Sequence, residues 1–155
     1  MTKSILPAVA LALAAMGPAA CVAESDPGAD AEAAARAEVT VNNAKLMLPA
    51  VAGNPGAVYF DLANTGTRDM MISGAKVVGA ANTEMHITEP TGMQRILQVM
   101  IKAGETANFK EGGNHLMAME LADTIKPGDT AEVTLHFVGG DEIHFPATVH
   151  AAGDR

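Results

Sequence analysis

Short apolar segments separated by turns fill the chain from residue 38 onward, and no stretch sustains the 3.6-residue period of an amphipathic helix. The turns carry the usual residues, for example Asn64-Thr65-Gly66 and Lys126-Pro127-Gly128-Asp129. The pattern predicts strands at 38–41, 44–48, 57–62, 70–78, 84–88, 93–101, 106–110, 115–121, 131–137 and 142–149. Many short strands at this spacing predict an all-β fold, an antiparallel Greek-key β-sandwich.

The first 37 residues have a different composition. Lys3 is followed by an apolar run over 5–16 and then by small residues up to Cys21, which predicts an export signal over 1–20. Cys21 is the single cysteine, and its position predicts lipidation of an exported lipoprotein; the alternative is ordinary cleavage nearby that leaves a free thiol. Residues 21–37 are rich in alanine and acids and predict a flexible tether before a folded domain at 38–155.

The net charge limits the classes of partner. The chain carries a formal charge of −8, and removal of residues 1–20 takes away Lys3 and no acid, which gives −9. Nucleic-acid binding is therefore not expected, because it requires a basic face that displaces phosphate counterions. An acidic surface serves solubility or favours a cationic partner.

Four side chains form the candidate site: His86, Met93, His115 and Met117. Two imidazoles and two thioethers suit soft Cu(I) better than Zn(II), Mg(II) or Ca(II), and a thioether binds without losing a proton. His115 and Met117 lie two positions apart on a predicted strand, so they share a face. A hairpin closed about Glu89-Pro90 would place His86 opposite Met93, with β-carbons about 4.5–5.5 Å apart. The pattern predicts one Cu(I) per chain.

Other readings of these residue types remain open. A single methionine in a sandwich usually fills the core and a single histidine usually makes a surface hydrogen bond. Met85 and Met119 are expected to pack in the core. Three further histidines could form a second Cu(II)-type or zinc site, or could lie on an exposed strand face: His136, His144 and His150. An electron-transfer copper site needs a thiolate, which only Cys21 could supply, and no spacing of nucleophile and base indicates an enzyme.

The segment from Glu84 to Leu121 resembles the periplasmic copper chaperones of the PCu(A)C family. That family has a histidine, ten residues, a methionine, twenty-one residues and then His-x-Met, and this chain has Met93, twenty-one residues and His115-x-Met117. The similarity extends to GAVYFDLANTG, HLMAMEL and IKPGDTAEVTLHF. One departure is that six residues, not ten, separate His86 from Met93. Removing two residues from each arm of a hairpin keeps the facing of both side chains; the alternative is that the shorter turn leaves a three-ligand site.

The resemblance implies a cupredoxin-like sandwich that binds Cu(I) in the periplasm and passes it on by ligand exchange. It implies a copper-accepting partner, either a cytochrome c oxidase subunit or another copper chaperone. The export signal and Cys21, for their part, predict contact with a membrane only through a lipid anchor. A copper buffer or resistance protein would use the same four side chains. A metal-free interaction module of the cell envelope is the alternative from another class, and copper would leave its stability unchanged.

Overall fold

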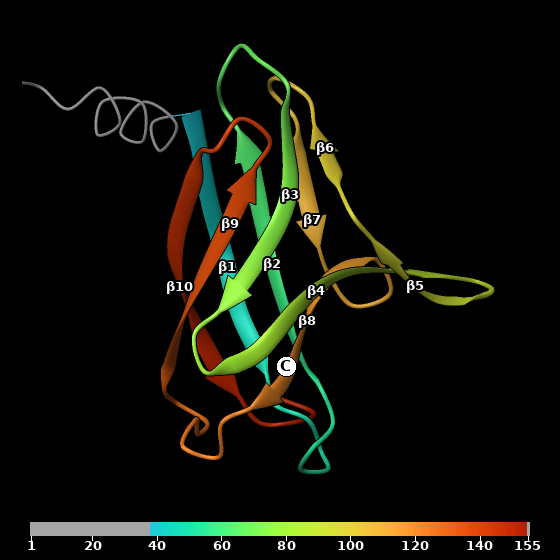
Figure 1. Ribbon diagram of the computed structural model, residues 1–155, viewed down its shortest axis with the longest axis vertical. Helices are drawn as coiled ribbons and strands as arrows, with labels where there is room; N and C mark the ends of the chain where they lie inside the picture. The colour runs from blue at the N-terminus through green and yellow to red at the C-terminus, as the bar shows by residue number, and fades with distance from the viewer. Residues whose placement is uncertain (1–37, 155) are drawn as a thin grey trace, which may run out of the picture.

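The computed structural model describes residues 38–154, and these form ten strands (Figure 1). The predicted export signal, Cys21 and the tether lie outside the described residues. The strands are β1 (Val39–Met47), β2 (Gly56–Asn64), β3 (Met70–Val77), β4 (Ala80–Glu89), β5 (Gly92–Ile96), β6 (Val99–Ile101), β7 (Thr106–Phe109), β8 (Asn114–Leu121), β9 (Thr130–Phe137) and β10 (Glu142–His150).

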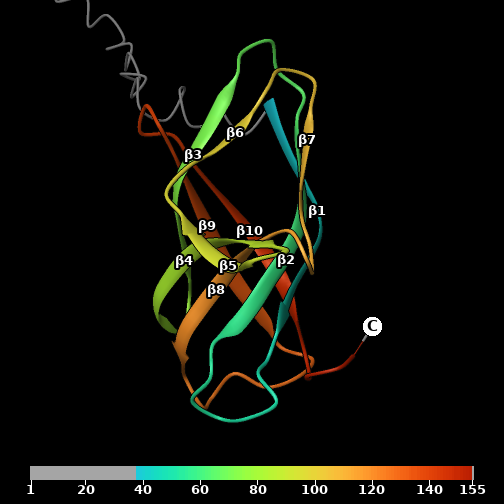
Figure 2. The same ribbon diagram turned by 90° about the vertical axis from the view of Figure 1, so that its right-hand side faces the viewer.

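All ten strands belong to one hydrogen-bonded sheet that folds over on itself (Figures 1 and 2). The order is β5-β4-β8-β7-β2-β1-β10-β9-β3-β6, with a further pairing of β8 with β2. Most pairs are antiparallel, but β1 runs parallel to β10 and β7 meets β8 in a short parallel contact. The predicted all-β sandwich is confirmed, and these two parallel pairings are features that the hydrophobic pattern does not reveal.

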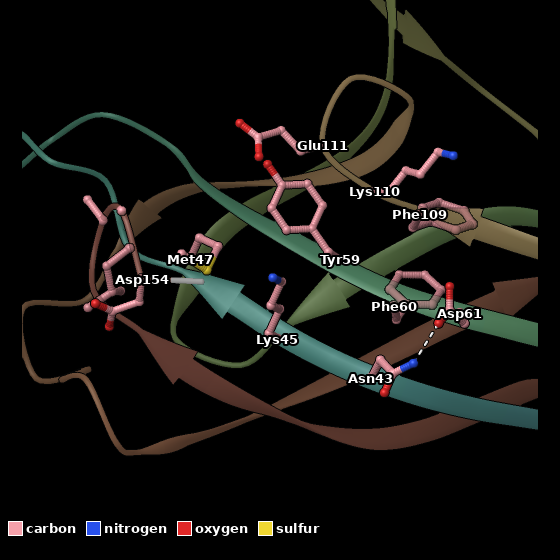
Figure 3. A pocket seen from close by; sticks show the side chains of 13 residues that line it. Asn43, Lys45, Met47, Tyr59, Phe60, Asp61, Phe109, Lys110, Glu111 and Asp154 are labelled. Atoms are coloured by element: carbon pink, nitrogen blue, oxygen red, sulfur yellow. Dashed lines mark hydrogen bonds between the residues drawn. The ribbon is translucent and has the colours of Figure 1, made fainter.

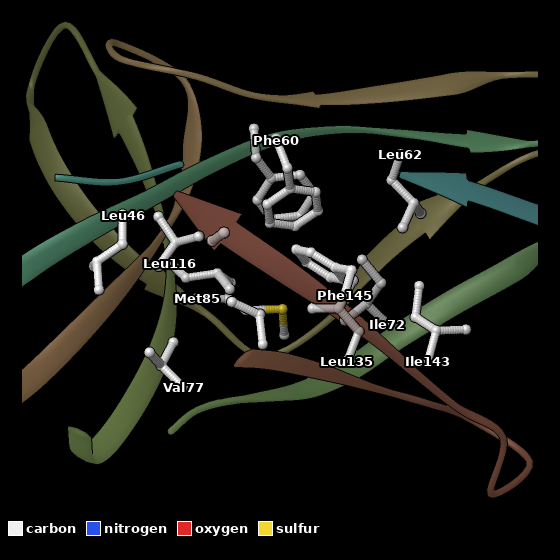
Figure 4. Packing of buried hydrophobic residues seen from close by; sticks show 14 of the residues in the cluster. Leu46, Phe60, Leu62, Ile72, Val77, Met85, Leu116, Leu135, Ile143 and Phe145 are labelled. Atoms are coloured by element: carbon white, nitrogen blue, oxygen red, sulfur yellow. The ribbon is translucent and has the colours of Figure 1, made fainter. Parts of the chain in front are cut away.

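The core lies between the two halves of the folded sheet (Figure 4). Strict alternation in β2 turns Val58, Phe60 and Leu62 inward, and each of them is essentially inaccessible to solvent. Phe60 stacks on Phe109 at 4.3 Å between ring centroids and meets Phe145 of β10 at 5.2 Å. These rings join the two halves, and burying such large apolar surfaces supplies much of the stability of the fold.

The predicted division of the chain into strands is wrong in two places, and the first is in the N-terminal strand of the sheet. The predicted strands at 38–41 and 44–48 are one strand, β1, with a bulge where the register with β2 shifts between Asn42 and Lys45. Asn43 adopts a φ of 55° there, a conformation that asparagine tolerates better than most residues, and its Nδ2 donates to Oδ2 of Asp61 at 2.7 Å.

Conversely, the predicted strand at 93–101 is two strands. β5 pairs with β4 and β6 pairs with β3, so the chain crosses from one edge of the sheet to the other within this segment. Leu97 lies at the crossing and is 70% exposed, although its neighbours in sequence suggest a continuous apolar run.

The β4–β5 hairpin extends away from the body of the molecule (Figure 1). Its outer strand β5 is exposed along most of its length. In the part of the chain that the structure describes, no helix is long and apolar enough to cross a membrane. The outer face of β4, β5 and β8 is where the candidate site lies.

Candidate functional site

Two histidines face each other across neighbouring strands. In the antiparallel pairing of β4 with β8, His86 lies directly opposite His115, and their ring centroids are 6.1 Å apart. Paired residues in a sheet point to the same face. His115 is buried, with 4% of its surface exposed, whereas 14% of the His86 side chain is exposed. The fold therefore brings together two imidazoles that are 29 positions apart in the chain.

Met117 shares this face because it lies two residues from His115 on β8, as the sequence predicted. It is half-buried and lies between Glu84 of β4 and Ala57 of β2. The small side chain of Ala57 leaves room on one flank of the thioether. His115 and Met117 thus sit in the middle of the sheet, where strands on both sides hold β8 in place.

Met93 lies on the same face, but its predicted position directly opposite His86 is wrong. The hairpin register pairs His86 with Arg95 and pairs Met93 with Thr88. The reason is the turn: Glu89 pairs with Gly92, so Pro90 and Thr91 form a two-residue loop, and Gly92 adopts a φ of 131°. This register displaces the partner of His86 by two residues, which preserves facing.

The shift places Met93 diagonally from His86. Residues at diagonal positions on neighbouring strands are about 7–8 Å apart. Met93 is 53% exposed, so its side chain is the most accessible of the four. A long, flexible thioether can still reach across a diagonal. The structure therefore groups three of the predicted side chains closely, with Met93 at the open end.

Hydrogen bonds hold both imidazoles. Nδ1 of His115 lies 2.9 Å from the carbonyl oxygen of Gly113. A carbonyl only accepts, so Nδ1–H donates and Nε2 keeps a free lone pair. Nε2 of His86 lies 3.0 Å from Oε2 of Glu84, while its Nδ1 is buried without a hydrogen-bond partner among the described residues.

Glu84 links the site to a cation. Its second oxygen, Oε1, lies 3.4 Å from Nη1 of Arg95 and 3.4 Å from Nδ2 of Asn82. The hydrogen bond from His86 is the largest influence and lowers the pKa of the Glu84 carboxyl. Burial comes next and raises it, while the charges of Arg95 and His86 and the hydrogen bond from Asn82 lower it, so that the pKa is lowered overall. Glu84 therefore stays ionised near neutral pH. The sequence analysis did not single it out, although its spacing of two from His86 on a strand would have placed both on one face.

A surface cavity lies beside the candidate site, and Figure 3 shows the side chains that line it. It has a volume of about 720 Å³, and its lining includes Lys45, Tyr59, Lys110 and Glu111 but none of the four predicted ligands. The Tyr59 ring lies 6.3 Å from that of His115, and burial, together with the charge of Glu111, raises the pKa of the Tyr59 hydroxyl. The candidate site is thus an open strand face with a phenol ring at its border, and not an enclosed pocket.

The two neighbouring methionines behave differently. Met85 is buried in the core, as predicted. The prediction for Met119 is wrong: it lies two residues after Met117 on β8, opposite Asn82, and is only half-buried. Met117 and Met119 have the same strand parity, so Met119 extends the thioether face outward from the site.

The three remaining histidines do not form a second cluster. His136 pairs with Glu142, 2.8 Å from its carboxylate, and His144 lies 2.9 Å from the Thr134 hydroxyl. His150 lies six residues further along β10 than His144, about 20 Å away on an extended strand. Within residues 38–154, no group of three or more His, Cys, Asp or Glu side chains is arranged to hold a metal ion. The alternative of an exposed strand face fits these residues.

The comparison with protein families gives a match that covers most of the chain. The family model described as "Putative lipoprotein LpqE-like" matches residues 22–149. Among curated proteins, "Putative lipoprotein Lxx21020" of Leifsonia xyli subsp. xyli is 29% identical over 105 residues. That match covers 64% of this chain and 63% of the relative, so the chain spans less than two thirds of its length.

Solved structures confirm the fold class. CuI-DR1885 from Deinococcus radiodurans is 26% identical, with 88% of this chain and 89% of that chain covered and a TM-score of 0.63. The copper-bound PCuAC domain from PmoF2 is 20% identical, with 74% of this chain and 93% of that domain covered and a TM-score of 0.64. The predicted cupredoxin-like sandwich is therefore confirmed.

Proposed function

This chain belongs to the LpqE-like family, and we propose that it binds one Cu(I) ion on the outer face of β4, β5 and β8 and delivers it to an acceptor. The observation that carries the proposal is the direct pairing of His86 with His115, with Met117 beside them and Met93 at the open end. Two imidazoles and two thioethers are a donor set for a soft, monovalent ion. The likeness to CuI-DR1885 supports this assignment.

The unequal accessibility of the four donors suggests how copper leaves. His115 is buried and Met117 half-buried, whereas Met93 is more than half exposed on the extended hairpin. An incoming donor from an acceptor would replace Met93 first, then His86, and finally the two donors of β8. Transfer would then proceed by stepwise ligand exchange, with no covalent reaction.

The acceptor is the finer part of the proposal. By the resemblance to PCu(A)C chaperones, we propose the copper centre of cytochrome c oxidase, or another copper chaperone, as the recipient. A transfer experiment tests this: the Cu(I)-loaded protein is mixed with a soluble copper-binding domain of an oxidase subunit, and copper is measured on each after separation. Retention of the metal by this protein would favour the alternative role of a copper buffer or resistance protein.

We also propose that the protein acts outside the cytoplasm, in the periplasm, held to the membrane by a lipid on Cys21. The apolar run before Cys21 and the lipoprotein descriptions of the family and of the Leifsonia relative support this. Mass spectrometry of the mature N-terminus, with Cys21→Ser as the comparison, tests it. An unmodified Cys21 in a soluble fraction would contradict the anchor.

Copper binding itself is tested by competitive titration of the purified protein with a colorimetric Cu(I) chelator. We expect one tight equivalent in the wild type, weakened in His86→Ala, Met93→Ala and His115→Ala. Loss in Met93→Ala and His115→Ala alone would indicate a site without His86. If the wild type binds no copper and its melting temperature does not change with copper, the metal-free interaction module becomes the better assignment.

A further inference from the structure

The two imidazoles of the site are held by different ring nitrogens. His115 uses Nδ1, 2.9 Å from the Gly113 carbonyl, and His86 uses Nε2, 3.0 Å from Glu84. Both acceptors are oxygens without a proton to give, as long as Glu84 is ionised. In the neutral state His115 is therefore the Nδ1–H tautomer and His86 is the Nε2–H tautomer.

The two oxygens of Glu84 have separate partners, which makes the carboxylate a fixed acceptor. Oε2 faces His86, while Oε1 lies 3.4 Å from both Arg95 and Asn82. Only 18% of the Glu84 side chain is exposed, against 58% for Arg95. A carboxylate with a partner on each oxygen orients an imidazole ring more firmly than a carboxylate that rotates freely. Carboxylates commonly orient metal-binding histidines in this way.

The other nitrogen of His86 has no partner. Nδ1 is inaccessible to solvent and makes no hydrogen bond with any described residue. Buried polar atoms without partners are rare in folded proteins because each costs desolvation free energy. With its proton on Nε2, the His86 ring keeps an unshared electron pair on Nδ1 that a metal ion could accept. Oδ1 of Asn114 is the other buried side-chain atom without a partner among the described residues. Because Nδ1 is enclosed, an ion reaches it only when a neighbouring side chain moves.

The spacing of the two rings fits a shared ion. Metal–nitrogen bonds are about 2 Å long, so two imidazoles on opposite sides of one ion have centroids on the order of 6 Å apart. The observed separation is 6.1 Å, with an angle of 35° between the ring planes. Nδ1 lies next to the ring's attachment to Cβ, so donation through Nδ1 keeps the ion close to the strand backbone.

We propose that Glu84 is a positioning residue that holds His86 as the Nε2–H tautomer, so that Cu(I) is bound by Nδ1 of His86 and by Nε2 of His115. This inference rests on the proposed copper site and names the donor atom of each histidine. It also assigns a role to Glu84 that does not involve contact with the metal.

The experiment is nuclear magnetic resonance of the purified protein labelled with ¹⁵N, at neutral pH. In the metal-free protein, long-range proton–nitrogen correlations identify the tautomer of each histidine. Ag(I) then replaces Cu(I) as a monovalent, diamagnetic probe, because the ¹⁰⁹Ag nucleus couples to the nitrogen that it binds. We expect the Nε2–H tautomer for metal-free His86, and silver coupling at Nδ1 of His86 and at Nε2 of His115.

Variants separate positioning from a structural role. In Glu84→Ala, we expect His86 to populate both tautomers and Cu(I) affinity to fall by about 10–100-fold, the usual effect of losing such a partner. Glu84→Gln keeps one acceptor oxygen and should retain most of the affinity, which also guards against a misfolded alanine variant. Glu105→Ala is the matched control, since that side chain is exposed in the turn before β7.

Each outcome has one meaning. Silver coupling at Nε2 of His86, or an Nδ1–H tautomer in the metal-free protein, would overturn the donor assignment while leaving the copper site in place. An unchanged tautomer and affinity in Glu84→Ala would overturn the positioning role. Absence of coupling to either histidine, together with no Cu(I) binding, would overturn the proposed function, and the metal-free tautomers would still show whether Glu84 orients His86.

Discussion

Two pairs of histidines lie on outer faces of the same sheet, and their surroundings differ. His86 and His115 are direct cross-strand partners, with thioethers beside them and one ring nitrogen on each without a hydrogen-bond partner among the described residues. His136 and His144 lie diagonally on β9 and β10, and each side chain is more than a third exposed. Carboxylates and a hydroxyl contact their rings.

The comparison shows that histidine count does not identify a site. An imidazole that already pairs with a carboxylate on an exposed strand behaves as a surface group, and such exposed pairs contribute little free energy. An imidazole that is buried, oriented through one nitrogen and left with a lone pair on the other is prepared to bind an ion. The difference comes from the strand register and the neighbouring residues.

The largest expected effect is on copper affinity when one histidine of each pair is removed. His115→Ala should weaken Cu(I) binding by more than about 100-fold, because loss of a donor exceeds the usual effect of losing an outer partner. His144→Ala should leave the affinity unchanged. Competitive chelator titration measures both, and thermal unfolding without copper checks that His115→Ala is folded. Equal losses in the two variants would remove the distinction between the faces.

The second effect concerns the diagonal position of Met93. Met93→Ala should weaken Cu(I) binding by about 10-fold or more. Arg95→Met in that background should restore part of the affinity, because position 95 lies directly opposite His86, although this change also removes the Arg95–Glu84 contact. Gln94→Met is the matched control, since Gln94 pairs with Ile87 and points to the other side of the hairpin. Restoration by Gln94→Met as well would show that the hairpin register is not what places the thioether.

The third effect is a pH dependence of the histidine–thioether face. Protons compete with copper for imidazole nitrogens, so Cu(I) affinity should fall as the pH drops from 7 to 5. Thioethers do not titrate, so this decline reports the histidines alone. Constant affinity from pH 7 to pH 5 in the chelator titration would show that the histidines do not bind the metal.

A fourth effect concerns stability without copper. The pKa of the Glu84 carboxyl is lowered in the folded protein from its ordinary value of 4.5. Ionised Glu84 therefore contributes fully to the free energy of unfolding above pH 4.5, and this contribution is lost as the pH falls through the lowered pKa. The stability difference between wild type and Glu84→Gln should therefore be constant above pH 4.5 and should shrink below it. Urea unfolding at a series of pH values measures this, with Glu105→Gln, a substitution at an exposed position, as the control.

The smallest effect is expected at the edge of the thioether face. Met119→Leu preserves volume and should change Cu(I) affinity by less than about threefold, whereas Met117→Leu should weaken binding strongly. The two residues lie on one face of one strand, so the pair tests whether the site ends at Met117. A large loss in Met119→Leu would extend the site to a further sulfur.

Much of the fold follows from local pattern. The alternation in β2 and the turns at its two ends predict that strand within two residues at each end. Failures occur where local pattern is silent: the bulge at Asn43 keeps one strand continuous, and the exposed Leu97 marks a crossing between sheet edges. Both depend on which strand lies alongside, and an apolar run does not encode that.

The candidate site divides in the same way. The shared face of His115 and Met117 is a matter of strand parity, which the sequence determines because side chains alternate along any strand. Donor chemistry, two imidazoles and two thioethers, is likewise a property of the residues themselves. The opposition of His86 and His115 is different, since 28 residues separate them and only the pairing of β4 with β8 brings them together.

The sequence by itself thus determined the all-β class, the facing of each candidate donor and the softness of the ion that they suit. The tertiary structure decided that His86 meets His115 and Arg95, that Met93 stands at a diagonal, and that Glu84 holds one ring nitrogen while Nδ1 remains free. The face of the sheet to which a side chain points alternates with a period of two residues, so it follows from the local sequence. Register is set by turn geometry and by contacts between distant strands, so it is known only once the chain is folded.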